Sequence, residues 1–64
     1  MVKINGEELD VTGRTVAQFL TESGYDIKRV AVELNGDILP KAQYESTVLQ
    51  DGDSAEIVIF VEGG

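Results

Sequence analysis

The stretch that most constrains the fold is residues 55–60, because its side chains are apolar on both sides of an extended backbone. In a strand, alternate side chains point to opposite faces. The odd-numbered residues therefore share one face, and Val58 and Phe60 share the other. A strand with apolar groups on both faces is usually central in its sheet. We expect a central strand whose core residues are Ala55, Ile57 and Ile59.

Two Asn-Gly pairs indicate where the chain reverses direction. Asn-Gly accommodates the positive φ values of a type I′ turn, which joins two antiparallel strands. Asn5-Gly6 separates two alternating segments, so it predicts a β-hairpin over residues 1–11. Asn35-Gly36 predicts a second turn between a strand over residues 30–34 and a short return strand that ends before the proline.

One helix is predicted, over about residues 16–23. Thr15 and Gln18 have the spacing of a capping box, and Gly24 can adopt the left-handed conformation that ends a helix. The apolar face of this helix comprises Val16, Phe19 and Leu20. A lone helix must bury that face against a sheet, which predicts a two-layer α+β domain and leaves the other sheet face open.

Several polar segments are interpreted as structural rather than functional. Asp51-Gly52-Asp53 resembles part of a calcium loop but lacks the remaining ligands, so a turn is expected. The segment after Pro40 is expected to form one helical turn that folds Tyr44 against the body. Arg14 and Lys28-Arg29 are expected to flank the helix as a scattered, exposed rim, with a small basic patch as the alternative.

Composition excludes several classes of site. The 64-residue chain contains neither cysteine nor histidine, which rules out disulfides, thiolate zinc sites, His-based metal sites and a hydrolytic triad within it. A net charge of −7 argues against binding to nucleic acid or to an anionic membrane. No apolar run approaches the roughly 20 residues of a membrane span, and no targeting segment is evident. We expect a cytoplasmic protein without a metal.

Val58 and Phe60 are the candidate binding residues. The single helix covers one sheet face only, so these two side chains are expected on the open face. An exposed apolar patch on a small domain often marks a protein interface. Coverage of the patch by loops or long polar side chains is the alternative.

The C-terminal Gly63-Gly64 pair is the candidate for chemistry. Glycines contribute no packing, yet they fit a channel too narrow for other residues. Domain boundaries are expected at residues 1–60 for the folded domain and 61–64 for a flexible tail. An activated terminal carboxylate of Gly64 would be an electrophile, whereas a frayed chain end is the alternative interpretation.

The order of predicted elements, together with the Gly-Gly end, resembles the ubiquitin-like β-grasp sulfur carriers of the ThiS/MoaD family, in particular its thiamine-biosynthesis branch. The resemblance spans essentially the whole chain. The matching segments are Ile4–Glu7, Thr15–Leu20, Arg29–Gly36 with Ile38–Lys41, Val48–Asp53 and Gly63-Gly64. The resemblance implies a mixed sheet of four to five strands with one main helix packed on one face.

In such carriers an E1-like (ThiF-like) adenylyltransferase uses ATP with Mg to adenylate the terminal glycine, here Gly64. A persulfide from a cysteine desulfurase or rhodanese-type donor then converts the adenylate to a thiocarboxylate, and thiazole synthase (ThiG-like) takes the sulfur. The resemblance implies a carrier rather than an enzyme, with no bound cofactor, monomeric when free. Glu62 departs from the small or apolar residue expected beside Gly63, and Val58 and Phe60 correspond to the family's docking surface.

Three alternatives stay open at this point. The small subunit of molybdopterin synthase shares the expected fold and the Gly-Gly end. A protein modifier, or another ubiquitin-like carrier for tRNA thiolation or cysteine synthesis, would use the same carboxylate. A binding module without chemistry would act through Val58 and Phe60 alone.

Overall fold

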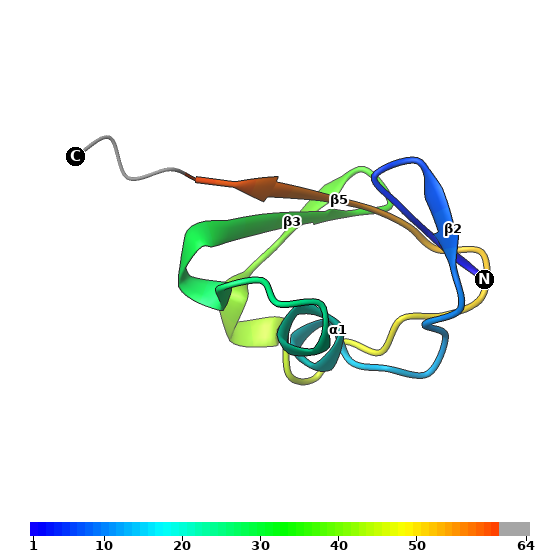
Figure 1. The fold of residues 1–64 in the computed structure, drawn as a ribbon, viewed down its shortest axis with the longest axis horizontal. Coiled ribbons are helices and arrows are strands. Elements are labelled where there is room, and N and C mark those ends of the chain that lie inside the picture. Colours follow the sequence, from blue (N-terminus) through cyan, green and yellow to red (C-terminus); the bar gives the residue numbers. More distant parts are fainter. Residues whose placement is uncertain (61–64) are drawn as a thin grey trace.

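A computed structural model describes residues 1–60 as a five-stranded mixed sheet with one α-helix on one face (Figure 1). The strands are β1 (Val2–Ile4), β2 (Glu7–Leu9), β3 (Val30–Leu34), β4 (Asp37–Leu39) and β5 (Ser54–Ile59). The helix α1 covers Val16–Glu22, and two 3₁₀ turns, η1 and η2, cover Ile27–Arg29 and Lys41–Gln43. The two-layer α+β architecture expected from the sequence is confirmed.

The sheet order is β2-β1-β5-β3-β4, so the last strand lies at the centre, as its apolar residues predict. β5 runs parallel to β1 and antiparallel to β3. The outer strands β2 and β4 are the hairpin partners of β1 and β3. The first and last strands of the chain therefore meet in the middle of the domain.

Both Asn-Gly pairs form the tight turns that the sequence predicts. Asn5 and Gly6 have φ values of 50° and 84°, and Asn35 and Gly36 have 52° and 89°. Positive φ at both central residues is the requirement of a type I′ turn, whose twist matches that of the strands it joins. Each turn sets the register of one hairpin in the sheet.

The helix starts at the predicted capping box. The Thr15 hydroxyl accepts a hydrogen bond from the backbone N–H of Gln18 at 3.0 Å, and the Gln18 side-chain oxygen accepts one from the N–H of Thr15 at 2.9 Å. Glu22 is the last helical residue, one residue before the predicted end. Gly24 follows with a φ of 84°, in the left-handed region that favours glycine at a helix end.

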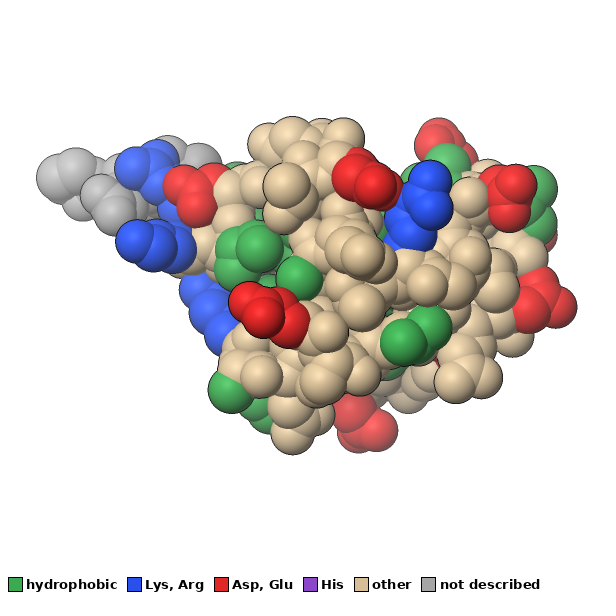
Figure 2. Space-filling view, turned by 90° about the horizontal axis from the view of Figure 1, so that it is seen from below, with side chains coloured by type: hydrophobic (Ala, Val, Ile, Leu, Met, Phe, Trp, Pro, Cys, Tyr) green, Lys and Arg blue, Asp and Glu red, His purple; other side chains and the backbone are tan. Residues whose placement is uncertain are grey.

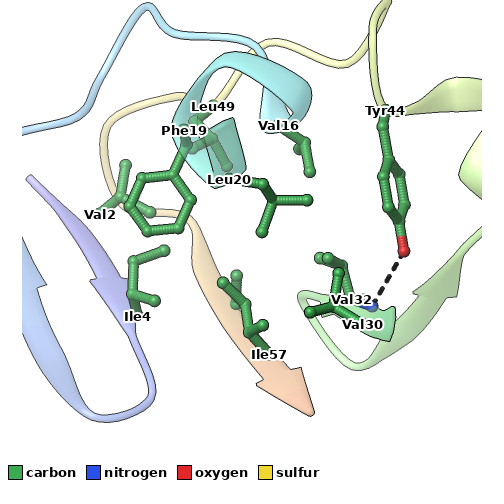
Figure 3. Close-up of a cluster of buried hydrophobic side chains, with 11 residues drawn as sticks. Val2, Ile4, Val16, Phe19, Leu20, Val30, Val32, Tyr44, Leu49 and Ile57 are labelled. Atoms are coloured by element: carbon green, nitrogen blue, oxygen red, sulfur yellow. Dashed lines mark hydrogen bonds between the residues drawn. The ribbon is translucent and has the colours of Figure 1, made fainter. Parts of the chain in front are cut away.

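The core lies between α1 and the inner face of the sheet (Figure 3). Its buried residues are Val2, Ile4, Val16, Phe19, Leu20, Val30, Val32, Tyr44, Leu49, Ala55 and Ile57. Full burial of a side chain such as Leu or Phe contributes about 1.5–3 kcal/mol. Tyr44 is buried as predicted, and its hydroxyl accepts a hydrogen bond from the backbone N–H of Val32 at 3.2 Å.

The prediction that Ile59 belongs to the core is wrong. Ile59 is 58% exposed, although Ala55 and Ile57 on the same side of β5 are buried. The reason is the difference in length between α1 and β5. The seven residues of α1 span roughly 10 Å at about 1.5 Å per residue, whereas the six residues of β5 span roughly 20 Å. The helix therefore covers only part of the strand, and the core ends at Ile57.

Within residues 1–60, α1 is too short to cross a membrane.

Candidate functional site

The first half of β5 is attached to the fold by the asparagines of both hairpin turns. The Asn5 side-chain oxygen accepts a hydrogen bond from the N–H of Ile57 at 2.7 Å, and its amide nitrogen donates to the carbonyl of Ile57 at 3.3 Å. The Asn35 side-chain oxygen accepts from the N–H of Ser54 at 2.9 Å. Sequence reasoning assigned both asparagines to turns alone, because their partners are 52 and 19 residues away.

The outer face of the sheet, which α1 does not cover, carries exposed apolar side chains near the end of β5. Val58 and Phe60 are 52% and 54% exposed, so the predicted exposure of this pair is confirmed. In the register of the sheet, Val58 lies opposite Ala31 of β3. Ile38 of β4, at 69% exposed, also faces outward, and we call Ala31, Ile38, Val58 and Phe60 the open-face patch.

Two carboxylates limit this patch on the side of the sheet where β5 begins. Glu33 and Glu56 lie directly opposite each other on β3 and β5, two residues along the strands from Ala31 and Val58, and Ile38 lies opposite Glu33 on its other side. Like charges in this position repel, which is unfavourable for the isolated domain. A partner that places a positive group between them would relieve that repulsion. A docking role for the open-face patch stays a prediction.

β5 ends at Ile59, one residue before the last residue that the structure describes. The Phe60 N–H donates to the Arg29 carbonyl at 2.6 Å, which connects the end of β5 to η1. The predicted tail, with Glu62, Gly63 and Gly64, lies outside the described residues. The roles predicted for these three residues, and the boundary between a domain over 1–60 and a tail over 61–64, therefore stay predictions.

Arg14, Lys28 and Arg29 are exposed, as predicted for a scattered rim. Arg14 is separated from the others and forms an ion pair with Glu22 at 2.7 Å. Lys28 and Arg29 instead lie beside Lys41, whose Nζ donates a hydrogen bond to the Lys28 carbonyl at 2.9 Å. The sequence places Lys41 more than ten residues from Lys28, so only the fold could show this grouping.

Two titratable groups with shifted pKa values, the N-terminal amine and the Asp51 carboxyl, lie away from the end of β5. The N-terminal amine donates to the Asp51 carboxylate. This hydrogen bond raises the pKa of the amine and lowers the pKa of the Asp51 carboxyl. Both groups are exposed to solvent, so the pair is a surface contact that joins the N-terminus to the turn before β5.

The described residues, 1–60, contain no group of three Asp or Glu side chains arranged to hold a metal ion.

Comparison with known proteins identifies the family. The ThiS family model matches residues 2–64. The sulfur carrier protein ThiS of Thermus thermophilus is 38% identical over 64 residues and is covered, like this chain, over its full length. The crystal structure of the thiamine biosynthesis protein ThiS from Geobacter metallireducens superposes with a TM-score of 0.78 at 30% identity, covering 98% of this chain and 97% of that one.

A much longer relative also matches. The thiazole synthase of Paramagnetospirillum magneticum is 47% identical over 62 residues, which are 95% of this chain but only 19% of that protein. This chain thus spans about one fifth of the length of that relative. The match over residues 2–64, the full-length relative and the shared ubiquitin-like β-grasp architecture together establish that this chain belongs to the ThiS family.

Proposed function

We propose that this chain is a sulfur carrier for thiamine biosynthesis and that the carboxyl group of Gly64 carries the sulfur. Membership of the ThiS family over residues 2–64 is the observation that carries the proposal. The fold supports it, because β5, the strand that precedes the Gly-Gly end in the sequence, is held at the centre of the sheet. The sequence also lacks the cysteine and histidine that most nucleophilic chemistry would require.

The proposed reaction begins with adenylation. An E1-like enzyme joins the Gly64 carboxylate to the α-phosphate of ATP, with Mg, and releases pyrophosphate. A persulfide sulfur then attacks the acyl carbon, and AMP leaves with the electrons of the broken C–O bond. A second thiol cleaves the resulting S–S bond and becomes part of a disulfide, which leaves a thiocarboxylate on Gly64. The persulfide comes from a cysteine desulfurase or a rhodanese-type donor.

Thiazole synthase is the proposed recipient of this sulfur. The thiazole synthase of Paramagnetospirillum magneticum contains a segment 47% identical to this chain, which supports a direct association between carrier and synthase. The carrier therefore acts as a co-substrate rather than as an enzyme, and it binds no cofactor of its own. Because its partners act in the cytoplasm in this scheme, the cytoplasm is its proposed location.

Intact-mass spectrometry tests the proposal directly. After incubation with the E1-like enzyme, ATP, Mg and a sulfur donor, the mass should rise by about 16 Da as one oxygen is exchanged for sulfur at the activated acyl group. A variant lacking Gly64 should gain no sulfur while its unfolding free energy stays unchanged. A Glu62→Ala variant is the matched control, because it keeps both glycines. An unchanged mass with a verified enzyme would refute the proposal.

The same sample separates this role from other carrier pathways. The thiocarboxylate form should transfer its sulfur to thiazole synthase, with the mass returning to its starting value. Transfer to the acceptor of molybdopterin synthesis or tRNA thiolation, and none to thiazole synthase, would assign the chain to a different pathway. Binding to partners without any change in mass would leave only a binding module.

A further inference from the structure

A cluster of positive charge lies beside the end of β5. It contains three of the five Lys and Arg residues in the chain, Lys28, Arg29 and Lys41, which we call the basic collar. Lys28 and Arg29 belong to η1, and the Arg29 carbonyl accepts from the N–H of Phe60 at 2.6 Å. Lys41 Nζ reaches the Lys28 carbonyl at 2.9 Å, so all three residues lie beside the point where β5 ends. All three are exposed.

The basic collar is on the helix side of the sheet, not on the open-face patch. η1 packs next to α1, and its first residue, Ile27, contacts the core under the helix. Figure 2, which views the molecule from that side, shows Lys and Arg side chains gathered at the end toward which β5 runs. Ile59, which is exposed on this same side of β5, lies opposite Val30, the residue after the collar's Arg29.

The charge of the basic collar is opposite to that of the chain as a whole, which is −7. Among residues 1–60, the only ion pair of the collar joins Arg29 to Asp26, at 3.6 Å between two exposed groups. Such a pair contributes little and leaves the cations accessible to a partner. An acidic domain with one basic end has a charge asymmetry, and this orients it as it approaches a charged surface.

We propose that the basic collar docks against an acidic protein surface at the entrance to the site of the E1-like enzyme. This inference depends on the proposed function, because it takes that enzyme as the partner. The four residues after Phe60 span at most about 13–14 Å when extended. With that segment extended, the collar would lie about 13–14 Å behind the reacting carboxyl, which favours a contact with the protein rim over one with the nucleotide phosphates. With the open-face patch on one side and the basic collar on the other, the partner would contact both faces of the sheet at the end of β5.

A charge-reversal variant with a matched control tests this. Lys28→Glu reverses one charge of the basic collar, and Lys3→Glu makes the same change in net charge at the other end of the sheet, where Lys3 lies opposite Ser54. The association rate constant with the E1-like enzyme is measured by stopped-flow fluorescence at ionic strengths of about 0.05 M and 0.5 M. Urea unfolding of both variants shows that each is folded. Lys41→Gln, which removes a different positive charge of the basic collar, is an independent second test.

Lys28→Glu should lower the association rate about tenfold at low ionic strength, and less than about twofold at high ionic strength, where salt screens the charges. Lys3→Glu should lower it less than about threefold, and Lys41→Gln should follow Lys28→Glu with a smaller loss. Equal losses for Lys28→Glu and Lys3→Glu would overturn the proposal, since net charge alone would explain them. An effect confined to the KM for ATP would overturn it in favour of a nucleotide contact.

The result of the association assay does not depend on sulfur transfer. The association assay requires only that the two proteins bind, whereas the mass measurement requires the complete reaction. A wild-type chain that binds but gains no sulfur would refute the proposed function and leave the charge comparison interpretable. Failure of wild-type binding at both ionic strengths would refute the partner and the collar together.

Discussion

The two halves of β5 are held in different ways. From Ser54 to Ile57 the strand has a neighbour on each side, with β1 paired through Ala55 and the Asn5 side chain bonded to both backbone groups of Ile57. Val58 and Ile59 pair with β3 alone, and Phe60, the residue after β5, bonds to the Arg29 carbonyl of η1. Ala55 and Ile57 are buried, whereas every residue of the second half is more than half exposed.

The difference shows how a small domain can anchor a strand and still present its end. The anchored half contributes to the core, while the exposed half adds little burial and stays accessible on both faces. The change occurs where β1 and α1 no longer reach. β1 has three residues against six in β5, and the seven residues of α1 span a shorter distance because a helix rises less per residue than a strand. In a sulfur carrier, this arrangement would keep the docking residues and the reactive terminus on one continuous segment.

The largest expected effect is a difference in unfolding free energy between substitutions in the two halves of β5. Ile57→Ala removes a buried side chain and should lower the free energy of unfolding by about 2–4 kcal/mol through lost burial and a cavity. Ile59→Ala, on the same side of the strand, should lower it by less than about 1 kcal/mol, because that side chain is already exposed. Urea unfolding measures both. Equal losses would mean that the core extends to the end of β5.

The next effect concerns binding rather than stability. Phe60→Asp places a carboxylate in the open-face patch and should weaken binding to the E1-like enzyme or thiazole synthase at least about tenfold. Its free energy of unfolding should change by less than about 0.5 kcal/mol, since Phe60 is exposed. Isothermal titration calorimetry measures the affinity. Glu8→Gln, exposed on an outer strand, is the control, and unchanged affinity of the Phe60 variant would exclude an interface there.

A smaller effect is expected at the attachment of the first half. Asn5→Gly keeps a residue suited to the positive φ of 50° but removes both side-chain hydrogen bonds to Ile57. The unfolding free energy should fall by about 1 kcal/mol, and hydrogen exchange at the Ile57 amide should become faster. Asn35→Gly is the parallel test at Ser54. No change in exchange at Ile57 would show that the Asn5 side chain does not hold this part of the strand.

The smallest effect involves the turn before β5. The lowered pKa of Asp51 gives a contribution that is present above its ordinary pKa and is lost as the pH falls through the lowered value. The raised pKa of the N-terminal amine gives one that is present below its ordinary pKa and is lost as the pH rises through the raised value. Asp51→Asn should slightly flatten the dependence of unfolding on pH at both extremes. An NMR titration in which the amine pKa of the variant equals that of the wild type would contradict this.

Local patterns predicted most of the fold. The two Asn-Gly pairs, the capping box at Thr15 and the alternation in residues 55–60 depend on neighbours within a few positions, and the hairpins, helix and central strand follow from them. The exposure of Val58 and Phe60 also followed, because one helix can cover only one face of a sheet. Ile59 was predicted wrongly, since its burial depends on how far α1 extends over β5.

The sequence by itself determined the elements, the open sheet face and the Gly-Gly end, because each depends on local conformational preference or on the number of helices available. Only the tertiary structure decided where the core ends, which asparagine side chains hold β5, and that Lys41 joins Lys28 and Arg29 at the strand's end. These features depend on element lengths and on contacts between residues far apart in the chain. No local pattern encodes them, because they arise when the sheet brings its first and last strands together.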